Sequence, residues 1–243
     1  MNAFEPGPRS VLRSVESMGA MLVRTWTPTG TETRRLVFCR GFLLRPDGYD
    51  EMLTLVASHG VAVFAPVSHR RDPAALVGMR SPPAEAHDVG RLVSELGHPA
   101  IAGHSRGGQV AWLVARDHPV AGLVAIDPVA RTSPRGPSSN HGGKVQVAAW
   151  DAPTMIIGAS HGGRCAPKGR NHEVFVAAAP DRARHIVAAM GHGDMLSGGA
   201  RRLVRAICSG VEDPSGVPRA VGGLVVCHLL GVPTDGCPVS LAE

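Results

Sequence analysis

The sequence predicts an α/β fold with a mostly parallel central sheet and helices on both of its faces. Short apolar runs alternate along the chain with longer segments of helical period, which is the pattern of a wound α/β sheet. These apolar runs are continuous rather than alternating, as in strands that are buried on both faces. With 243 residues, the chain is long enough for a large core, and we expect residues 1–243 to form a single domain.

Strands are predicted where a short apolar run is bounded by glycine, proline or polar residues. The first two are close enough to form an N-terminal hairpin, and Pro66 is expected to end the strand that begins at Val61. In chain order, the predicted strands are Ser10–Glu16, Met21–Thr25, Leu36–Cys39, Val61–Ala65, Ala100–Ala102, Gly122–Ile126, Thr154–Gly158 and His185–Ala189.

Helices are predicted where apolar residues recur every three to four positions. His59 and Gly60 end the first of them. The predicted helices are Tyr49–Ser58, Ala84–Leu96, Gln109–Asp117, Asn171–Ala178, Ala200–Cys208 and Arg219–Leu230. The segment Thr132–Val145 is rich in Ser, Pro, Gly and Asn, and we interpret it as a surface loop or lid.

The composition excludes several classes of protein. The chain is 44% hydrophobic with a net charge of +5, which is not the composition of a disordered polyelectrolyte. Its longest apolar stretches, Leu224–Leu230 and Gly122–Ile126, are too short to span a bilayer. The basic residues form no stripe with interleaved aromatics, so no nucleic-acid partner is expected. Met1–Pro8 lacks the apolar segment of a secretory signal, which favours a cytoplasmic location.

The five cysteines form neither a CxxC pair nor a zinc-finger spacing, and their odd number argues against a disulfide scaffold as the main source of stability. Cys39 and Cys227 lie in apolar runs and are interpreted as core residues. A bridge between Cys208 and Cys237, or one that involves Cys165, stays open. The 12 histidines are not clustered in ligand spacing, so no metal and no cofactor are expected.

The segment Gly103–Gly107, with the sequence Gly-His-Ser-Arg-Gly, fits a nucleophile elbow. This motif places a serine on a sharp turn between a strand and a helix, with its hydroxyl exposed at the carboxyl end of the sheet. Gly103 and Gly107 are required because a side chain at either position would collide across the turn. Ser105 is therefore the candidate nucleophile. The alternative is a glycine-rich phosphate turn, but no GxGxxG motif or P-loop lysine accompanies it.

A serine nucleophile needs a histidine as base and an acid that orients the histidine. Two histidines are candidates for the base. His192 follows the last predicted strand in a glycine-containing loop, from which its imidazole can reach back over the sheet. His185 belongs to that strand itself. We therefore predict His192 as the base.

The acid is predicted one strand earlier than its commoner place. The loop after the strand Thr154–Gly158 has no carboxylate before Glu173. Asp127 directly follows the preceding strand and so lies at the carboxyl edge of the sheet. A turn-capping role is the alternative for Asp127. Asp151 lies at the wrong end of its strand, and Asp194 is so near His192 that a turn-forming role is favoured.

An acyl-transfer site also needs two donors for the oxyanion. The backbone N–H of Arg106, directly after the nucleophile, is the first predicted donor. The second is the N–H of Phe42 in the loop after the strand Leu36–Cys39, because Gly41 lets the backbone turn inward. Leu43 is the alternative second donor.

Several segments resemble those of chlorophyllases, and the resemblance runs over nearly the whole chain. Its most specific part is the elbow with arginine after the serine, Gly103–Gly108. The other similar segments are Phe4–Gly7, Gly41–Leu44, Val56–Gly60, Ala125–Val129, Cys165–Pro167, Asn171–His172, Gly191–His192, Asp194–Leu196, Arg219 and Val221–Gly223. The family usually has histidine before the oxyanion glycine, where this chain has Arg40, and the segments between strands are shorter here than in plant members.

The resemblance implies an α/β-hydrolase fold and a triad of Ser105, Asp127 and His192. It also implies cleavage of the phytyl ester of chlorophyll, whereas the residue pattern alone indicates only a serine hydrolase. Two alternatives stay open. One is a general esterase, lipase-like or polyester-cleaving, or an acyltransferase. The other is a non-catalytic protein that binds a tetrapyrrole or terpenoid.

The expected partner is a hydrophobic ester, and the sequence does not predict an oligomeric state. Candidate substrate-binding residues are Leu43, Trp150, Met190 and Met195, because they flank the inferred site or a neighbouring loop. An ordinary core role is the alternative for the two methionines. Asn171 and His172 are expected to orient a loop or cap a helix.

Overall fold

The computed structural model describes residues 1–69, 80–130, 145, 150–179 and 181–242. Its centre is a nine-stranded sheet in the order β1-β2-β4-β3-β5-β6-β7-β8-β9. The strands from β4 to β8 in this order run parallel, while β1, β2 and β9 pair antiparallel with their neighbours. The strands are β1 (Val11–Met18), β2 (Met21–Pro28), β3 (Arg34–Cys39), β4 (Val61–His69), β5 (Ala100–His104), β6 (Leu123–Ile126), β7 (Thr154–His161), β8 (Ala183–Gly191) and β9 (Leu241–Ala242).

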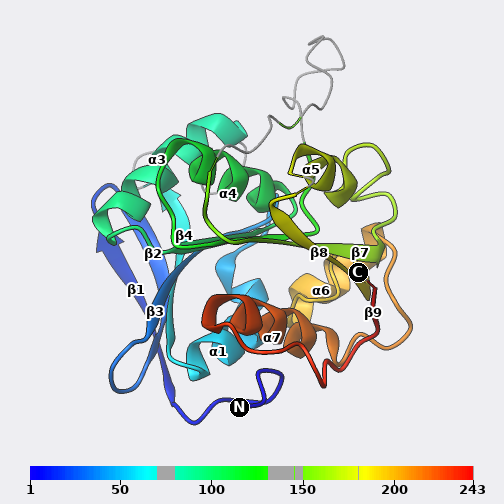
Figure 1. Ribbon diagram of the computed structural model, residues 1–243, viewed down its shortest axis with the longest axis horizontal. Coiled ribbons are helices and arrows are strands. Elements are labelled where there is room, and N and C mark those ends of the chain that lie inside the picture. The colour runs from blue at the N-terminus through cyan, green and yellow to red at the C-terminus, as the bar shows by residue number, and fades with distance from the viewer. Residues whose placement is uncertain (70–79, 131–144, 146–149, 180, 243) are drawn as a thin grey trace.

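Helices cover both faces of this sheet. They are α1 (Asp50–Ser58), α3 (Pro82–Glu95), α4 (Arg106–Asp117), α5 (His172–Ala178), α6 (Gly198–Ile207) and α7 (Val217–Leu230), and a short 3₁₀ helix, η1 (Pro46–Tyr49), precedes α1. Figure 1 shows α3, α4 and α5 on one face and α1, α6 and α7 on the other. The predicted fold class, a mostly parallel sheet with helices on both faces, is confirmed.

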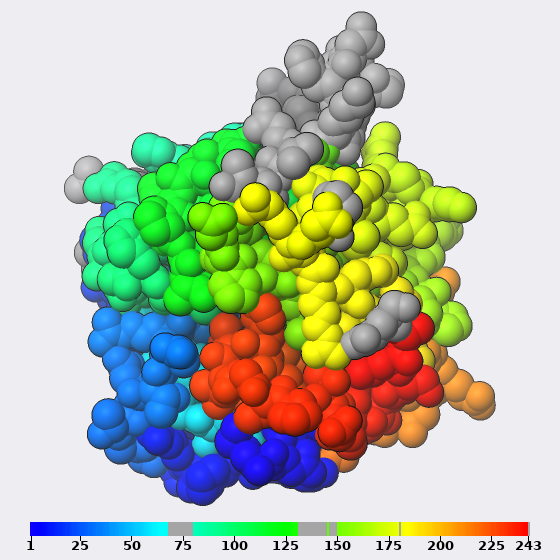
Figure 2. All heavy atoms as spheres, viewed as in Figure 1, coloured from blue at the N-terminus to red at the C-terminus, as the bar shows by residue number. Residues whose placement is uncertain are grey.

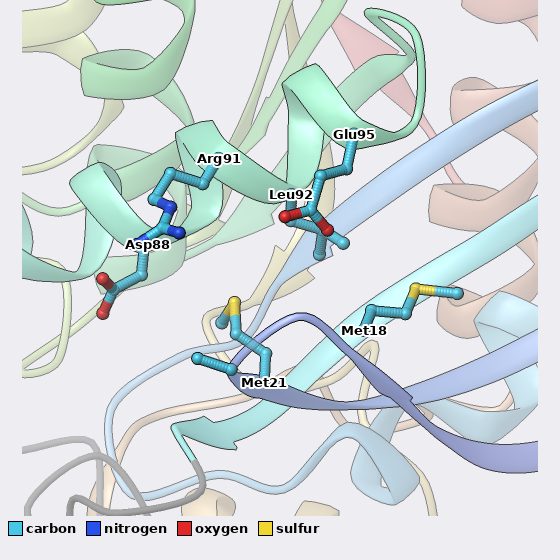
Figure 3. A pocket seen from close by; sticks show the side chains of 7 residues that line it. Met18, Met21, Asp88, Arg91, Leu92 and Glu95 are labelled. Carbon is cyan, nitrogen blue, oxygen red and sulfur yellow. The ribbon is translucent and has the colours of Figure 1, made fainter.

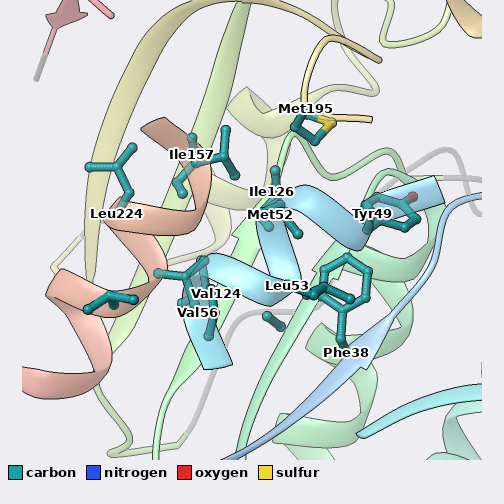
Figure 4. Close-up of a cluster of buried hydrophobic side chains, with 14 of the residues drawn as sticks. Phe38, Tyr49, Met52, Leu53, Val56, Val124, Ile126, Ile157, Met195 and Leu224 are labelled. Atoms are coloured by element: carbon teal, nitrogen blue, oxygen red, sulfur yellow. The ribbon is translucent and has the colours of Figure 1, made fainter. Parts of the chain in front are cut away.

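The core lies in two layers, one on each side of the sheet. In β3, Phe38 belongs to the layer under α1 and α7, whereas Val37 and Cys39 belong to the layer under α3 and α4. Successive side chains of a strand point to opposite faces, so both sets need cover. The first layer is drawn in Figure 4, where the ring of Phe38 lies beside that of Tyr49. This double burial explains why the strand sequences are continuously apolar.

The N-terminal segment packs against α7 and completes the first layer. Figure 2 shows these two parts of the chain in contact at the surface. Phe4 is buried, and a Cβ at Gly223 would lie 2.2 Å from the Phe4 ring, so the glycine makes room for it. Arg219 Nη1 donates to the carboxylate of Glu5 at 3.2 Å.

Most element boundaries differ from the predicted ones by one to three residues, and three differences affect the interpretation. Pro66 does not end its strand, because β4 continues to His69. Leu22 lies opposite Ser68 and Val23 lies opposite Pro66, so Val67 is an extra residue in β4, and such a bulge accommodates a residue that has no N–H to donate. α4 begins at Arg106, three residues earlier than predicted. β9 was not predicted, since two residues carry no period.

The structure pairs Cys165 with Cys208 in a disulfide across 43 residues of chain, which closes the question left open by the sequence. Cys39 and Cys227 are buried and free, as predicted, and Cys237 is also free.

Two further predictions concern the loop or lid and the absence of a membrane span. The proposed loop or lid Thr132–Val145 lies outside the described residues except for Val145. Among the residues that are described, no helix is both long and apolar enough to cross a membrane.

Candidate active site

The elbow positions Ser105 between the end of β5 and the start of α4. Its backbone has φ 56° and ψ −123°, a conformation that non-glycine residues rarely adopt. A Cβ at Gly103 would lie 2.1 Å from the Gly107 carbonyl oxygen, and one at Gly107 would lie 2.1 Å from that of Cys39. The two glycines are therefore needed where the sequence predicts them. The strained turn lifts Ser105 Oγ above the carboxyl ends of the strands.

The structure brings the three predicted catalytic residues together in one line of hydrogen bonds. Ser105 Oγ lies 2.9 Å from His192 Nε2, and His192 Nδ1 lies 2.6 Å from Asp127 Oδ2. An ionised carboxylate can only accept a hydrogen bond, so the Nδ1 proton of His192 is donated to Asp127. Nε2 is thereby left as the acceptor for the Ser105 hydroxyl, which is the arrangement a general base requires.

Asp127 is fully buried and its carboxylate is well supplied with donors. It follows β6 directly and has a φ of 36°. Its Oδ1 accepts from the Ala159 N–H at 3.2 Å and from His172 Nδ1 at 3.1 Å. Burial by itself raises the pKa of Asp127, but the hydrogen bonds from His172 and His192 outweigh it and lower the pKa to about 2. The carboxylate is therefore ionised at neutral pH, as an orienting acid must be.

His172 is a part of this site that the sequence did not identify. It was expected only to orient a loop or cap a helix, yet its ring binds the free oxygen of the acid. It begins α5, and a Cβ at Gly158 would lie 2.5 Å from its ring, so β7 keeps a space for the imidazole. Two signals were available in the sequence. Asn171–His172 is one of the segments of the family resemblance, and Gly158 is a glycine in an apolar run, which often marks a close approach by another group.

The loop after β3 carries the predicted second oxyanion donor. The Gly41 N–H donates to the Tyr49 hydroxyl at 3.0 Å, and the Leu44 N–H returns to the Gly41 carbonyl at 3.3 Å. Leu43 has a φ of 57° in this tight turn. Phe42 stays the predicted donor of this loop, with Leu43 as the alternative. The other predicted donor, Arg106, is the first residue of α4, where a backbone N–H has no acceptor within the helix.

The side chains of the two arginines beside this site brace the surrounding loops. Arg106 Nη1 lies 2.5 Å from a carboxylate oxygen of Glu85 in α3, and its Nη2 donates to the Arg80 carbonyl. Arg40 donates to the carbonyls of Leu44 at 3.0 Å and Val67 at 3.3 Å. It thus ties the loop after β3 to the neighbouring strand.

The loop that carries His192 is held by a second buried carboxylate. Asp194 Oδ2 accepts from the N–H of Gly191 at 2.7 Å and from that of Val211 at 2.9 Å. The turn-forming role expected for Asp194 is therefore confirmed.

The four predicted substrate-binding residues are not brought together. Leu43 is 60% exposed, next to the predicted oxyanion donor. Met190 and Met195 have no exposed surface and belong to the core layer under α1 and α7, which is the alternative that the sequence left open. Trp150 packs edge-on against Trp112 with ring centroids 4.8 Å apart, and its Nε1 donates to the Thr154 hydroxyl at 2.9 Å, at the end of β7 away from Asp127.

A separate small hollow lies between the turn that joins β1 to β2 and α3. Figure 3 shows Met18 and Met21 on one side of it and Asp88, Leu92 and Glu95 on the other. The elements that line it carry none of the three predicted catalytic residues. Within the described part of the chain, no group of three His, Cys, Asp or Glu side chains is arranged to hold a metal ion.

Comparison with known proteins assigns the chain to a family. A family model described as Chlorophyllase matches residues 86–234, more than half of the chain. Chlorophyllase-1 of Arabidopsis thaliana is 30% identical over 241 residues, which cover 85% of this chain and 74% of that protein. Chlorophyllase-1, chloroplastic, of Citrus sinensis is 29% identical over 242 residues, which cover 84% and 70%. Chlorophyllase-2 of Arabidopsis thaliana is 28% identical over 228 residues, which cover 80% and 71%. The chain therefore belongs to the chlorophyllase family and is a carboxylic-ester hydrolase.

Proposed function

We propose that this chain hydrolyses the phytyl ester of chlorophyll, or a similarly bulky hydrophobic ester, through an acyl-enzyme on Ser105. The observation that carries the proposal is the pair of hydrogen bonds that joins Ser105 to His192 at 2.9 Å and His192 to Asp127 at 2.6 Å. The family supports an ester as the substrate class. The name shared by its relatives supports chlorophyll as the ester.

In the acylation step, Ser105 Oγ attacks the ester carbonyl carbon while its proton passes to His192 Nε2. The negative charge that forms on the carbonyl oxygen is held by the N–H groups of Phe42 and Arg106. The C–O bond to the alcohol then breaks, and the alcohol leaves with the proton from Nε2. Asp127 stays ionised and stabilises the imidazolium while it exists.

In the deacylation step, a water molecule takes the place of the alcohol. His192 accepts one proton of the water, and the resulting hydroxide attacks the acyl carbon. The bond to Ser105 breaks, the proton returns from Nε2 to Oγ, and the carboxylic acid is released.

We further propose that Leu43 contacts the apolar part of the ester. Leu43 is apolar and yet 60% exposed. It has a φ of 57° and directly follows Phe42 in the loop after β3, residues 40–44, which we call the oxyanion loop. An exposed leucine next to a reacting carbonyl presents surface that a hydrophobic substrate can cover.

The test is hydrolysis of chlorophyll a and of a short-chain p-nitrophenyl ester by the unmodified protein and by Ser105→Ala. We expect chlorophyllide and phytol as products, and a loss of at least about a thousandfold in the rate for both esters in the variant. Ser160→Ala is the matched control, because Ser160 Oγ also lies 2.8 Å from a histidine nitrogen, that of His161, but outside the site. It should retain the full rate.

The two esters separate the proposal from its nearest alternative. Cleavage of the short ester without cleavage of chlorophyll a would favour a general esterase. A Ser105→Ala variant with the full rate on either ester would contradict the proposed nucleophile. For Leu43→Ala, we expect a higher KM for the bulky ester and little change for the short one.

A further inference from the structure

A chain of buried aromatic rings connects the core to the base of the proposed triad. Phe38 contacts Tyr49 with ring centroids 4.8 Å apart, Tyr49 contacts His104 at 5.6 Å, and His104 contacts His192 at 4.7 Å. Tyr49 and His104 have no exposed surface. Neither takes part in the proposed mechanism, although His104 directly precedes Ser105. Both are polar residues buried beside the reacting serine, and burying polar groups costs free energy unless they are hydrogen-bonded.

The polar atoms of this pair join two separate parts of the site. The Tyr49 hydroxyl lies 3.0 Å from the Gly41 nitrogen and 2.7 Å from His104 Nδ1. His104 Nε2 lies 2.8 Å from the carbonyl oxygen of His192. One end of the path is therefore the oxyanion loop, and the other end is the backbone of the proposed base.

The direction of each hydrogen bond follows from the atoms at the two ends. A carbonyl oxygen can only accept, so His104 Nε2 carries a proton and donates it to His192. The Gly41 N–H can only donate, so it bonds to the Tyr49 oxygen. Burial lowers the pKa of His104 to about 3, so the ring is neutral and its Nδ1 accepts a hydrogen bond from the Tyr49 hydroxyl. At neutral pH, the Tyr49 hydroxyl therefore both accepts from Gly41 and donates to His104, and each nitrogen of His104 has one hydrogen-bond partner.

We propose that Tyr49 and His104 are positioning residues that hold the oxyanion loop and the backbone of His192 in fixed positions around Ser105. They touch no reacting atom. They fix the Gly41 peptide, so that the next N–H in the loop faces the oxyanion, and they fix the carbonyl of His192, so that its ring stays aligned with Ser105. The inference rests on the proposed function, since it concerns the same site.

A packing role alone is the competing explanation, and the chain offers variants that separate the two. Tyr49→Phe keeps the ring and removes only the hydroxyl. Phe38→Leu loosens the packing on the same ring and leaves both hydroxyl bonds in place. His104→Leu removes both polar atoms at similar volume, whereas His104→Gln keeps a donor and an acceptor.

The experiment measures kcat and KM for a short-chain p-nitrophenyl ester, together with the thermal midpoint of each variant. For Tyr49→Phe and His104→Leu we expect kcat to fall by about tenfold or more, with KM within about twofold, because small displacements of catalytic groups act on the chemical step. His104→Gln should recover part of the kcat that His104→Leu loses. Phe38→Leu should lower the thermal midpoint and leave kcat within about twofold.

Each outcome decides between the two explanations. If Tyr49→Phe keeps the kcat of the unmodified protein, or if Phe38→Leu loses as much kcat as Tyr49→Phe, the positioning role is wrong and packing suffices. Equal kcat values for His104→Gln and His104→Leu would also overturn it. An unmodified protein that hydrolyses no ester would instead overturn the proposed function, and the inference with it.

Discussion

Two neighbouring loops at the carboxyl edge of the sheet serve the same histidine in different ways. The loop after β6 provides Asp127, whose Oδ2 accepts from His192. The loop after β7 has no carboxylate, and it is held by the disulfide between Cys165 and Cys208. The donor on this side comes from β7 itself, since the N–H of Ala159 lies 3.2 Å from Asp127 Oδ1.

The difference shows how an acid can move by one strand while the site stays complete. Once the carboxylate lies after β6, the β7 side has to supply donors to its second oxygen. Ala159 and His172 do so, and Gly158 makes room for the ring of His172. Gly162 passes close to the same carboxylate, since its Cβ would lie 3.7 Å from Asp127 Oδ2. The strand β7 and the helix α5 therefore support an acid that follows β6.

The largest expected effect comes from the acid itself. Asp127→Asn keeps the shape of the side chain but cannot stabilise the imidazolium, so we expect kcat to fall by roughly a thousandfold to ten-thousandfold. Asp151→Asn is the matched control, since Asp151 is exposed at the opposite end of β7. Comparable kcat values for the two variants in an ester assay would show that the acid is not Asp127.

The next largest effect is expected from removing the disulfide between Cys165 and Cys208. We expect the double variant Cys165→Ser, Cys208→Ser to lose roughly 2–5 kcal/mol of unfolding free energy, because the bridge restricts the unfolded chain. Chemical denaturation measures this loss of unfolding free energy. An unchanged unfolding free energy would mean that the loop after β7 is held by its other contacts, and a reduced kcat in the folded variant would mean that the bridge also positions Asp127.

A smaller effect is expected from His172, the second histidine that is hydrogen-bonded to Asp127. His172→Gln weakens the bond to Asp127 Oδ1, so the pKa of Asp127 should rise and kcat should fall by about tenfold, the size expected for one hydrogen bond to a charged group. His185→Gln is the control, because its ring packs beside that of His172, with the centroids 5.3 Å apart, but is not one of the hydrogen-bond donors to Asp127 described above. Equal kcat values for both variants would exclude a role for the bond to Asp127.

The smallest effect is a dependence of stability on pH. The pKa of Asp127 is about 2 in the folded protein against an ordinary value of 3.8. The unfolded chain therefore binds the proton more tightly, so this contribution to stability is complete above about pH 5 and is lost as the pH falls toward 2. Between pH 5 and pH 3 the unmodified protein should lose about 1 kcal/mol more unfolding free energy than Asp127→Asn. Identical pH dependences would show that Asp127 is not held as described.

The sequence predicted the parallel sheet and the line from Ser105 to Asp127 because each of those features is local. A continuous apolar run marks a buried strand, and the residue that follows it marks the carboxyl edge. Ser105, Asp127 and His192 each follow such a run. Their meeting in space then follows from strands that are parallel.

The remaining parts of the site depend on contacts between segments that are far apart in the chain. His172 reaches Asp127 across 45 residues, and His104 reaches Tyr49 across 55. A local signal such as Gly158 indicates that some group comes close to the strand, but it does not identify that group. The burial of Met190 and the position of Trp150 also depend on how whole elements pack. Pro66 was misjudged because a bulge at Val67, which arises from the pairing of β4 with β2, accommodates it.

The most direct test of the account is covalent labelling with a fluorophosphonate, followed by mass spectrometry of the labelled peptide. The phosphorus reacts with a serine oxygen only where a base and oxyanion donors activate it. The account predicts that the label is found on Ser105 in the unmodified protein, and that labelling is much slower in Asp127→Asn. A label on another serine, or a protein that is not labelled at all, would contradict the triad of Ser105, His192 and Asp127.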